Sequence, residues 1–361
     1  MDDNKISVAV VGDKGTGKTS IISSLYRFAD SKYQPPNWKD YKISVKGKGF
    51  FSNEDIVNVY EYTQKKLGEY QTEGEFAAEV DSKSSFSEYN YKMKVYSSDF
   101  EITFCDTPRM YESDSYSNRR INNVIKKADV IIVAVDAPSV MEKHDCWEQI
   151  ERTARNCSRR LISAMTSAEA PKLIIFVPTK CEKYYYEGRL WEVSNQICEL
   201  YHDFFEEFAC IIDSDESRGD NEEKYRSAKH FATISPIITM GVPVFERYKN
   251  PRRINSAHYH IRKNKNLEVK LSEKIFIAIA NFLIVQNLCK TEIIVKEYTD
   301  DDRGEALLTL GAKGLAAMFG VRTPYARVNW DHLLSDGERQ EVVADVLFTT
   351  EYEHGYKEFY R

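Results

Sequence analysis

The sequence predicts an α/β fold, a three-layer sandwich in which helices cover both faces of a mostly parallel β-sheet. Short apolar runs of strand length alternate with amphipathic segments of helix length, a pattern typical of parallel strands buried on both faces. One pair of alternating segments is separated by a short polar turn, which indicates an antiparallel hairpin at or near the sheet edge. With 42% apolar residues among 361, the chain can fill a core of this kind.

The first strand is expected over 6–11, followed by a helix over 18–28. Residues 31–86 are polar and aromatic without a clear period. An insertion of that length inside a compact domain is expected to be functional or partly helical. The hairpin comes next, with strands over 89–96 and 100–105.

Beyond the hairpin, strands and helices alternate regularly. The expected strands are 130–135, 173–177 and a last one at 230–234, and the expected helices are 117–127, 145–165, 190–208 and a closing helix at 272–289. This rhythm defines one domain over 1–290, which contains 31–86 as an insertion. Residues 291–361 break the rhythm and are expected to form a small C-terminal appendage of unknown role.

Charge and composition exclude several classes of protein. The chain has 50 Lys and Arg against 56 Asp and Glu, a net charge of −6, so an extended nucleic-acid-binding surface is not expected. Its seven cysteines include no C-x-x-C pair, which favours reduced thiols over disulfides or a zinc site. The longest apolar run, 275–285, contains Asn281 and is too short to span a membrane. The N-terminus has no leader pattern, so a cytoplasmic location is expected.

A glycine-rich loop lies between the first strand and the first helix. It reads Gly12-Asp13-Lys14-Gly15-Thr16-Gly17-Lys18-Thr19, followed by Ser20. The glycines allow backbone N–H groups to surround a triphosphate, and the helix that follows adds the positive end of its dipole. Lys18 is predicted to reach the β- and γ-phosphates, and the Thr19 hydroxyl to ligate Mg²⁺. All nine residues, 12–20, are predicted to bind nucleotide, which makes the predicted fold that of a P-loop NTPase.

A second metal residue is expected at a strand end, and Asp106 closes the strand 100–105. The run Asp106-Thr107-Pro108-Arg109 resembles the Asp-x-x-Gly motif of translation-factor-related and Ras-like GTPases. The resemblance places Arg109 where the family has its switch glycine and Met110 where Ras-like enzymes have a water-positioning glutamine. Arg109 is either a built-in charge for the transition state or an ordinary solvated arginine.

These departures from the family pattern imply slow hydrolysis, as does the bulk of Lys14 in the phosphate loop. The predicted catalytic residues are Lys18, Asp106 and Arg109, and the predicted Mg²⁺ residues are Thr19 and Asp106. The threonine that would close over the metal is not assigned, although Thr63 and Thr72 are candidates.

The base is expected to be read by Thr179-Lys180-Cys181-Glu182, which resembles the (Asn/Thr)-Lys-x-Asp motif that selects guanine. A carboxylate accepts the N1–H and exocyclic N–H of guanine, a pair of donors that adenine lacks. The Lys180 stem would cover the base, and Thr179 would tie the motif to the phosphate loop. Glu182 is one methylene longer than the usual Asp. A backbone N–H for the guanine carbonyl would come from Ile234 or Ser235, at the end of the last strand.

A wider resemblance covers residues 5–290. The segments 135–138, 180–184 and 234–237 are similar to prokaryotic GTPase-domain proteins of the Ras-like (TRAFAC) class related to the double-GTPase group. The resemblance implies a Mg²⁺-dependent, GTP-binding molecular switch with slow hydrolysis, in a regulatory or defence system. The expected partner is a protein or a second copy of the chain, held through the switch regions or the C-terminal tail. An ATPase or nucleotide kinase, and a scaffold that binds nucleotide without hydrolysing it, remain as alternatives.

Overall fold

The computed structural model describes the chain from residue 5 to residue 283, with gaps. The described residues are 5–13, 15–29, 41–45, 75–77, 86–95, 98–108, 115–142, 147–168, 170, 172–213, 230–241, 243–248, 257–262, 269–272, 274–276, 278–280 and 282–283. The predicted C-terminal appendage lies outside them, as do Lys14, Arg109, Met110, Thr63 and Thr72.

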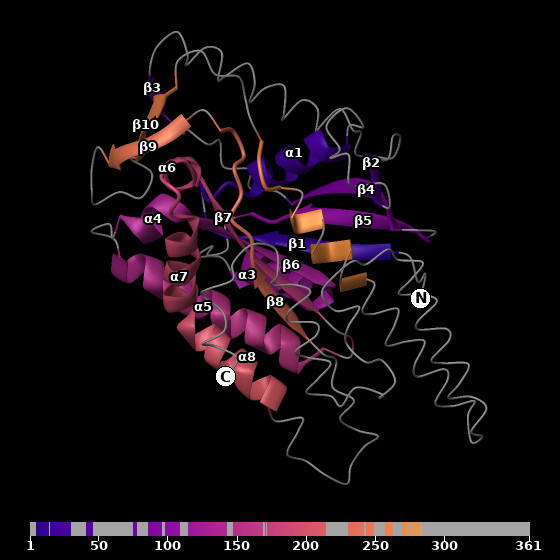
Figure 1. Ribbon diagram of the computed structural model, residues 1–361. Coiled ribbons are helices and arrows are strands. Elements are labelled where there is room, and N and C mark those ends of the chain that lie inside the picture. Colours follow the sequence, from indigo (N-terminus) through magenta and orange to yellow (C-terminus); the bar gives the residue numbers. More distant parts are fainter. Residues whose placement is uncertain are drawn as a thin grey trace, which may run out of the picture.

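Among the described residues, seven strands form the main sheet, in the order β2-β4-β5-β1-β6-β7-β8. The strands are β1 (Lys5–Val11), β2 (Tyr41–Val45), β4 (Ser87–Val95), β5 (Ser98–Asp106), β6 (Val130–Asp136), β7 (Leu173–Thr179) and β8 (Phe231–Ile234). The five strands β5, β1, β6, β7 and β8 run parallel, whereas β2 and β5 both pair antiparallel with β4. The predicted mostly parallel sheet with an antiparallel hairpin is confirmed (Figure 1). Its outermost strand at this edge is β2, which comes from the 31–86 insertion.

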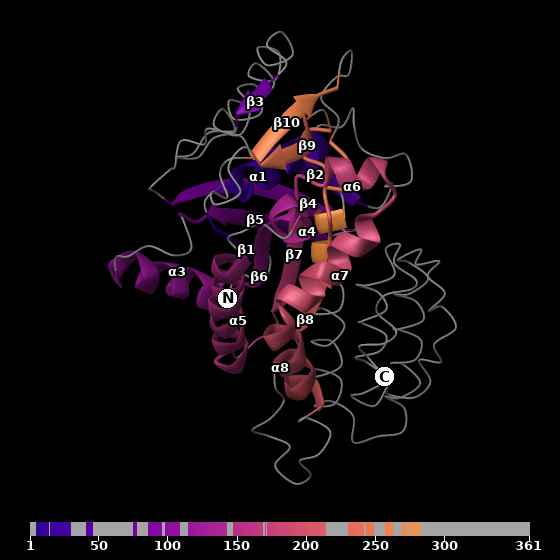
Figure 2. The same ribbon diagram turned by 90° about the vertical axis from the view of Figure 1, so that its left-hand side faces the viewer.

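Helices cover both faces of this sheet, as the sequence predicts (Figures 1 and 2). The helices are α1 (Lys18–Ala29), α3 (Ser115–Lys127), α5 (Trp147–Thr166), α7 (Leu190–Leu200) and α8 (His202–Asp213). Side chains of β1 alternate between the two layers: Val8 and Val10 pack with α1, and Ala9 and Val11 pack with the other four helices. This alternation follows from the two-residue period of a strand and explains why the strand has no polar face.

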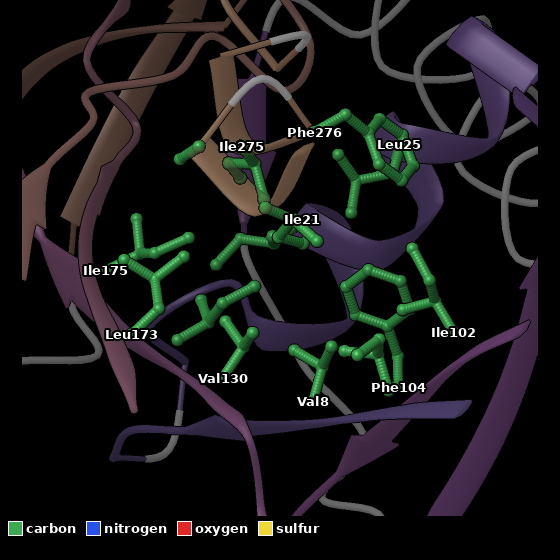
Figure 3. Packing of buried hydrophobic residues seen from close by; sticks show 14 of the residues in the cluster. Val8, Ile21, Leu25, Ile102, Phe104, Val130, Leu173, Ile175, Ile275 and Phe276 are labelled. Atoms are coloured by element: carbon green, nitrogen blue, oxygen red, sulfur yellow. The ribbon is translucent and has the colours of Figure 1, made fainter. Parts of the chain in front are cut away.

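The core on the α1 side contains several aromatic side chains, among them Phe104 and Phe276 (Figure 3). The Phe104 ring on β5 lies 5.1 Å from that of Tyr91 on β4 and 6.4 Å from that of Phe276, measured between ring centroids. Phe276 belongs to the helical residues between 274 and 283, which match part of the predicted closing helix. The Tyr91 hydroxyl donates to the Ile22 carbonyl at 2.9 Å, so the buried ring also has its polar atom satisfied.

The predicted single helix over 190–208 is wrong. The chain forms two helices, α7 and α8, which meet at Tyr201, where the backbone leaves helical geometry with φ −104° and ψ 25°. The Tyr201 ring packs on Phe176 of β7, with ring centroids 4.8 Å apart. Both helices bury apolar side chains against the same layer, and the apolar period alone therefore does not reveal the break.

A second, antiparallel sheet lies outside the predicted pattern. Among the described residues it consists of β3 (Glu75–Ala77), β10 (Ala257–Ile261) and β9 (Pro243–Tyr248), in that order. Two short helices follow strands of the main sheet: α4 (Ala137–Met141) after β6 and α6 (Glu182–Tyr186) after β7. Both views place the small sheet beside α6 (Figures 1 and 2). There the Lys183 ammonium lies 5.6 Å from the centre of the Phe245 ring on β9.

In the part of the chain that the structure describes, no helix is long and apolar enough to cross a membrane.

Candidate nucleotide-binding site

The phosphate loop leaves the carboxyl end of β1 and enters α1, as the sequence predicts. Gly12 has φ 154°, and a Cβ there would lie 2.7 Å from Thr16 Oγ1 and 2.8 Å from the Ala134 carbonyl oxygen of β6. The Ala134 carbonyl is part of the strand backbone and cannot move aside as a flexible side chain could. No larger residue therefore fits at position 12 without a shift of the loop. Gly15 and Gly17 have φ 78° and 84°, values at which glycine avoids the strain of a side chain.

Hydrogen bonds within the loop fix its shape. Thr16 Oγ1 donates to the Asp13 carbonyl at 2.9 Å. The Lys18 ammonium donates to the carbonyls of Gly12 and Asp13, at 3.0 Å in each case. Burial lowers the pKa of Lys18, and the carboxylates of Asp106 and Asp13 partly oppose this shift. A phosphate in the loop would add a further anionic partner for this buried cation, beside these two carboxylates.

The two predicted metal residues lie in direct contact. The Thr19 hydroxyl donates to Asp106 Oδ2 at 2.7 Å. Asp106 is buried at the end of β5, and the parallel register pairs it with Val10 of β1 immediately before the loop. Thr107 secures this strand end, because its N–H and its hydroxyl both donate to the Val10 carbonyl, at 3.2 and 2.8 Å.

A hydroxyl and a carboxylate oxygen are hard ligands of the kind that Mg²⁺ prefers. The described residues contain no group of three or more His, Cys, Asp or Glu side chains that could hold a metal by themselves. Mg²⁺ is commonly held by one or two protein oxygens together with phosphate and water.

The Thr179 hydroxyl connects the end of β7 to the phosphate loop. It donates to the Thr16 carbonyl at 2.8 Å and lies 3.2 Å from the Val135 carbonyl of β6. A Cβ on Gly17 would lie 3.3 Å from Thr179 Oγ1, so the loop passes closely over this side chain. The first residue of the predicted base motif therefore lies beside the predicted phosphate site.

Lys180 follows with φ 56°, an uncommon value for a residue with a side chain. Its ammonium lies 2.6 Å from Asp136 Oδ2 at the end of β6. Burial disfavours the charged lysine, but the attraction of Asp136 outweighs it and raises the pKa of Lys180. Lys180 is therefore a fixed cation at the carboxyl edge of the sheet.

Glu182 is the first residue of α6 and is only 3% exposed. Its Oε1 accepts backbone N–H groups from Met240 at 3.4 Å and Gly241 at 3.2 Å. Burial raises the pKa of Glu182, and these backbone donors act in the opposite direction. At least one oxygen of the predicted base-reading carboxylate is thus engaged by the loop that follows β8.

Ser235, the other predicted base contact, follows β8 directly. Its N–H donates to the Phe176 carbonyl at 2.8 Å, so that donor is used within the sheet. Its hydroxyl is buried and has no hydrogen-bond partner among the described residues. The geometry of this residue thus offers a side-chain contact rather than the predicted backbone N–H.

Sequence reasoning missed the residues that surround Lys180. The partner of Lys180, Asp136, is visible in the sequence only as the end of an apolar strand. Tyr248 and Tyr259 come from the unpredicted second sheet and act electrostatically on the Lys180–Asp136 pair. These contacts depend on how the two sheets pack together, and no local sequence pattern predicts that packing.

No protein-family model and no curated protein matches this sequence. Solved structures do resemble it. The signal recognition particle receptor SRb-GTP/SRX complex from Chaetomium thermophilum is 13% identical with a TM-score of 0.32, over 64% of this chain and 90% of that one. The ADP-ribosylation-factor-like, small COPII coat GTPase SAR1 from Encephalitozoon cuniculi with GDP is 9% identical with a TM-score of 0.27, over 63% and 68%. The GTP-bound GTPase-like domain of S. cerevisiae Ski7 is 12% identical with a TM-score of 0.34, over 78% and 50%.

Likeness at this level does not reveal what the chain binds. Its own strand order and phosphate loop define the fold, a P-loop NTPase sandwich with an antiparallel edge.

Proposed function

We propose that this protein is a Mg²⁺-dependent GTP-binding switch that hydrolyses GTP slowly. The contact between Thr19 and Asp106 at 2.7 Å, beside the phosphate loop, carries the proposal. It supports a metal–triphosphate site because the two oxygens come from the positions that P-loop enzymes use for Mg²⁺.

Each residue has a distinct role at the phosphate end. The N–H groups of the loop bind phosphate oxygens, and the Lys18 ammonium balances the charge of the β- and γ-phosphates. Thr19 and Asp106 would hold Mg²⁺, Thr19 through its hydroxyl and Asp106 through its carboxylate at the strand end. Mg²⁺ bound there would neutralise charge that develops on the phosphate oxygens.

At the base end, Thr179 sets the distance between the motif and the phosphate loop. The Lys180 stem covers one face of the base, and Glu182 accepts the two guanine N–H groups. The Met240 and Gly241 N–H groups support this role by orienting the Glu182 carboxylate, which has lone pairs beyond those that they occupy. Ser235 contributes its buried hydroxyl from the neighbouring strand end.

Slow hydrolysis follows from the residues after Asp106. Arg109 has less access to positive φ than a glycine, and Met110 has no group that could orient water. Slow intrinsic hydrolysis fits a molecular switch whose hydrolysis is activated by a protein partner or by a second copy of the chain. We place it in a prokaryotic regulatory or defence system on the resemblance of its motifs alone.

Competition calorimetry with GTP and ATP in the presence of Mg²⁺ tests the proposal. We expect GTP to bind at least about tenfold more tightly, because adenine leaves the Glu182 carboxylate without its donors. Thr19→Ala should remove most of the Mg²⁺ dependence of GTP binding, whereas Asp203→Asn on the exposed side of α8 should leave it unchanged. Equal affinities for GTP and ATP would contradict the proposal.

That outcome would favour the ATPase alternative, which one observation supports. Glu182 is 3% exposed and already accepts two backbone N–H groups, as expected if it only anchors the loop after β8.

Single-turnover hydrolysis with protein in excess tests the scaffold alternative, a protein that binds nucleotide without hydrolysing it. A wild-type protein that binds GTP tightly and cleaves none of it is a nucleotide-bound scaffold.

A further inference from the structure

Lys180 and Asp136 form an ion pair at the ends of neighbouring strands. Their side chains are 22% and 10% exposed, and the atoms Nζ and Oδ2 lie 2.6 Å apart. The register of β6 and β7 pairs Asp136 with Thr179, so the ion pair lies one residue from the side chain that contacts the phosphate loop. Asp136 is thereby placed at the carboxyl edge of the sheet, where open α/β sheets bind their ligands.

Stability alone does not explain this pair. A buried ion pair contributes little net stability because both charges lose their hydration, and the positive φ of Lys180 adds backbone strain. Asp136 precedes α4, where a carboxylate commonly caps the helix, yet its side chain makes no capping hydrogen bond. Its Oδ1 is buried without a hydrogen-bond partner among the described residues. The carboxylate is thus directed to the lysine rather than to the helix.

The small sheet closes over the pair. Tyr259 on β10 is 3% exposed, and its hydroxyl interacts with the charges of Lys180 and Asp136. On the neighbouring strand β9, the Tyr248 hydroxyl donates to Ser139 Oγ of α4 at 3.3 Å. Tyr248 and Tyr259 of one sheet therefore both act on the ion pair at the strand end that carries Asp136.

We propose that Asp136, supported by Tyr259, is a positioning residue that holds the Lys180 side chain across the nucleobase, so that the small sheet forms a wall of the base site. This inference rests on the proposed nucleotide site. The inference goes beyond that site because it gives the second sheet a role in the affinity of the protein for the nucleobase. Phosphate binding should not depend on Asp136 or Tyr259. Lys18 and Thr19 belong to the phosphate loop, and Thr179 lies between this loop and the ion pair.

Calorimetry with two probes, Mg²⁺–GTP and Mg²⁺–tripolyphosphate, isolates the base contribution because tripolyphosphate has no base. Asp136→Asn should weaken GTP binding about tenfold, since the charge that fixes Lys180 is lost, and Tyr259→Phe should weaken it about threefold. Both variants should bind tripolyphosphate as the wild type does. Tyr91→Phe removes a buried hydroxyl that donates to the Ile22 carbonyl of α1, away from Lys180, and it serves as the matched control.

A double variant tests whether Asp136 acts through the lysine. Asp136→Asn combined with Lys180→Met should bind GTP no more weakly than Lys180→Met alone. Additive losses, or equal losses of GTP and tripolyphosphate affinity, would overturn the positioning role while leaving the proposed function intact. A wild type that binds GTP no more tightly than tripolyphosphate would instead overturn the proposed function. Thermal unfolding without ligand identifies a variant that fails to fold, and Tyr259→Phe, which removes one oxygen, then decides the case.

Discussion

At the scale of single residues, His230 is a buried imidazole at the start of β8. Its Nδ1 accepts the backbone N–H of Lys172 at 3.2 Å, which joins the entry to β8 with the entry to β7. Burial, together with the nearby charge of Lys172, lowers the pKa of His230 to about 4. The Lys172 ammonium in turn donates to the carbonyls of Lys126 and Ala128 at the end of α3. The imidazole is therefore kept neutral by its surroundings.

This pKa predicts a loss of stability in mild acid. An unfolded histidine takes up a proton near pH 6.5, whereas folded His230 does so only near pH 4, so the unfolded state binds more protons between these values. The free energy of unfolding should fall as the pH drops through this window, by about 3 kcal/mol from His230. Urea unfolding at a series of pH values measures the slope.

His230→Asn keeps an acceptor near the position of Nδ1 and removes the proton-binding site. Its free energy of unfolding should depend less on pH than that of the wild type, and the exposed His202→Gln serves as the control for losing a histidine. A variant with the full wild-type slope would show that other groups cause the acid sensitivity.

The residues at the phosphate end were predictable from the sequence, and those around the base were predictable only in part. Lys18 and Thr19 begin the helix after β1, and Asp106 ends β5. Since the carboxyl ends of parallel strands meet at one edge, chain order alone brings them together. The partners of Lys180 and Glu182 depend on the loop after β8 and on a second sheet, whose positions are set by tertiary packing.

At the scale of elements, the helical residues between 274 and 283 hold the edge of the sheet that carries the hairpin. The Phe276 ring lies 5.9 Å from Tyr91 of β4, between ring centroids, and contacts Phe104 of β5 from the same side. These rings meet edge to face, the arrangement that aromatic pairs prefer. The sequence segment just before the C-terminal region thus completes the layer begun by α1.

Phe276→Ala should destabilise the protein by about 3–5 kcal/mol, because it leaves a cavity between the helical segment and two strands. Trp191→Ala on α7 is the comparison, since Trp191 is 55% exposed and should contribute no more than about 0.5 kcal/mol. Chemical denaturation of both variants measures the difference. Similar losses for the two would mean that the segment does not pack as described.

The elements that escaped prediction share a physical cause. Strands β2 and β3 are short and lie in a polar, aromatic insertion with no period, so nothing local distinguishes them from loop. Strands β9 and β10 follow a strand that already completes the main sheet, and β10 pairs both with β9 and with β3 from a distant part of the chain. Long apolar strands such as β6 and β7 were predictable because they are buried on both faces.

At the scale of the whole molecule, the phosphate loop lies between β1, which contributes to both cores, and α1, which covers one face. A ligand that binds this loop only in the folded state stabilises the whole folded protein against unfolding. At about 100 times its dissociation constant, Mg²⁺–GTP should raise the free energy of unfolding by about 2.7 kcal/mol. Tm should rise by a few degrees.

Thermal unfolding with GTP, before and after removal of Mg²⁺ by a chelator, measures this effect. The rise in Tm should shrink without the metal, and it should be small in Thr19→Ala whether or not the metal is present. A shift of equal size with and without Mg²⁺ would show that the ion has no part in the site.

The insertion over 31–86 has a further consequence for how the protein could be dissected. It supplies β2 and β3, and each of these strands forms the end of a sheet. Excising the insertion to obtain a minimal nucleotide-binding core would leave β4 and β10 with unpaired backbone N–H and C=O groups along one side. Such bare edges pair with other chains. A shortened form of the protein should therefore keep these two strands, so that β4 and β10 stay paired, and change only the residues between them.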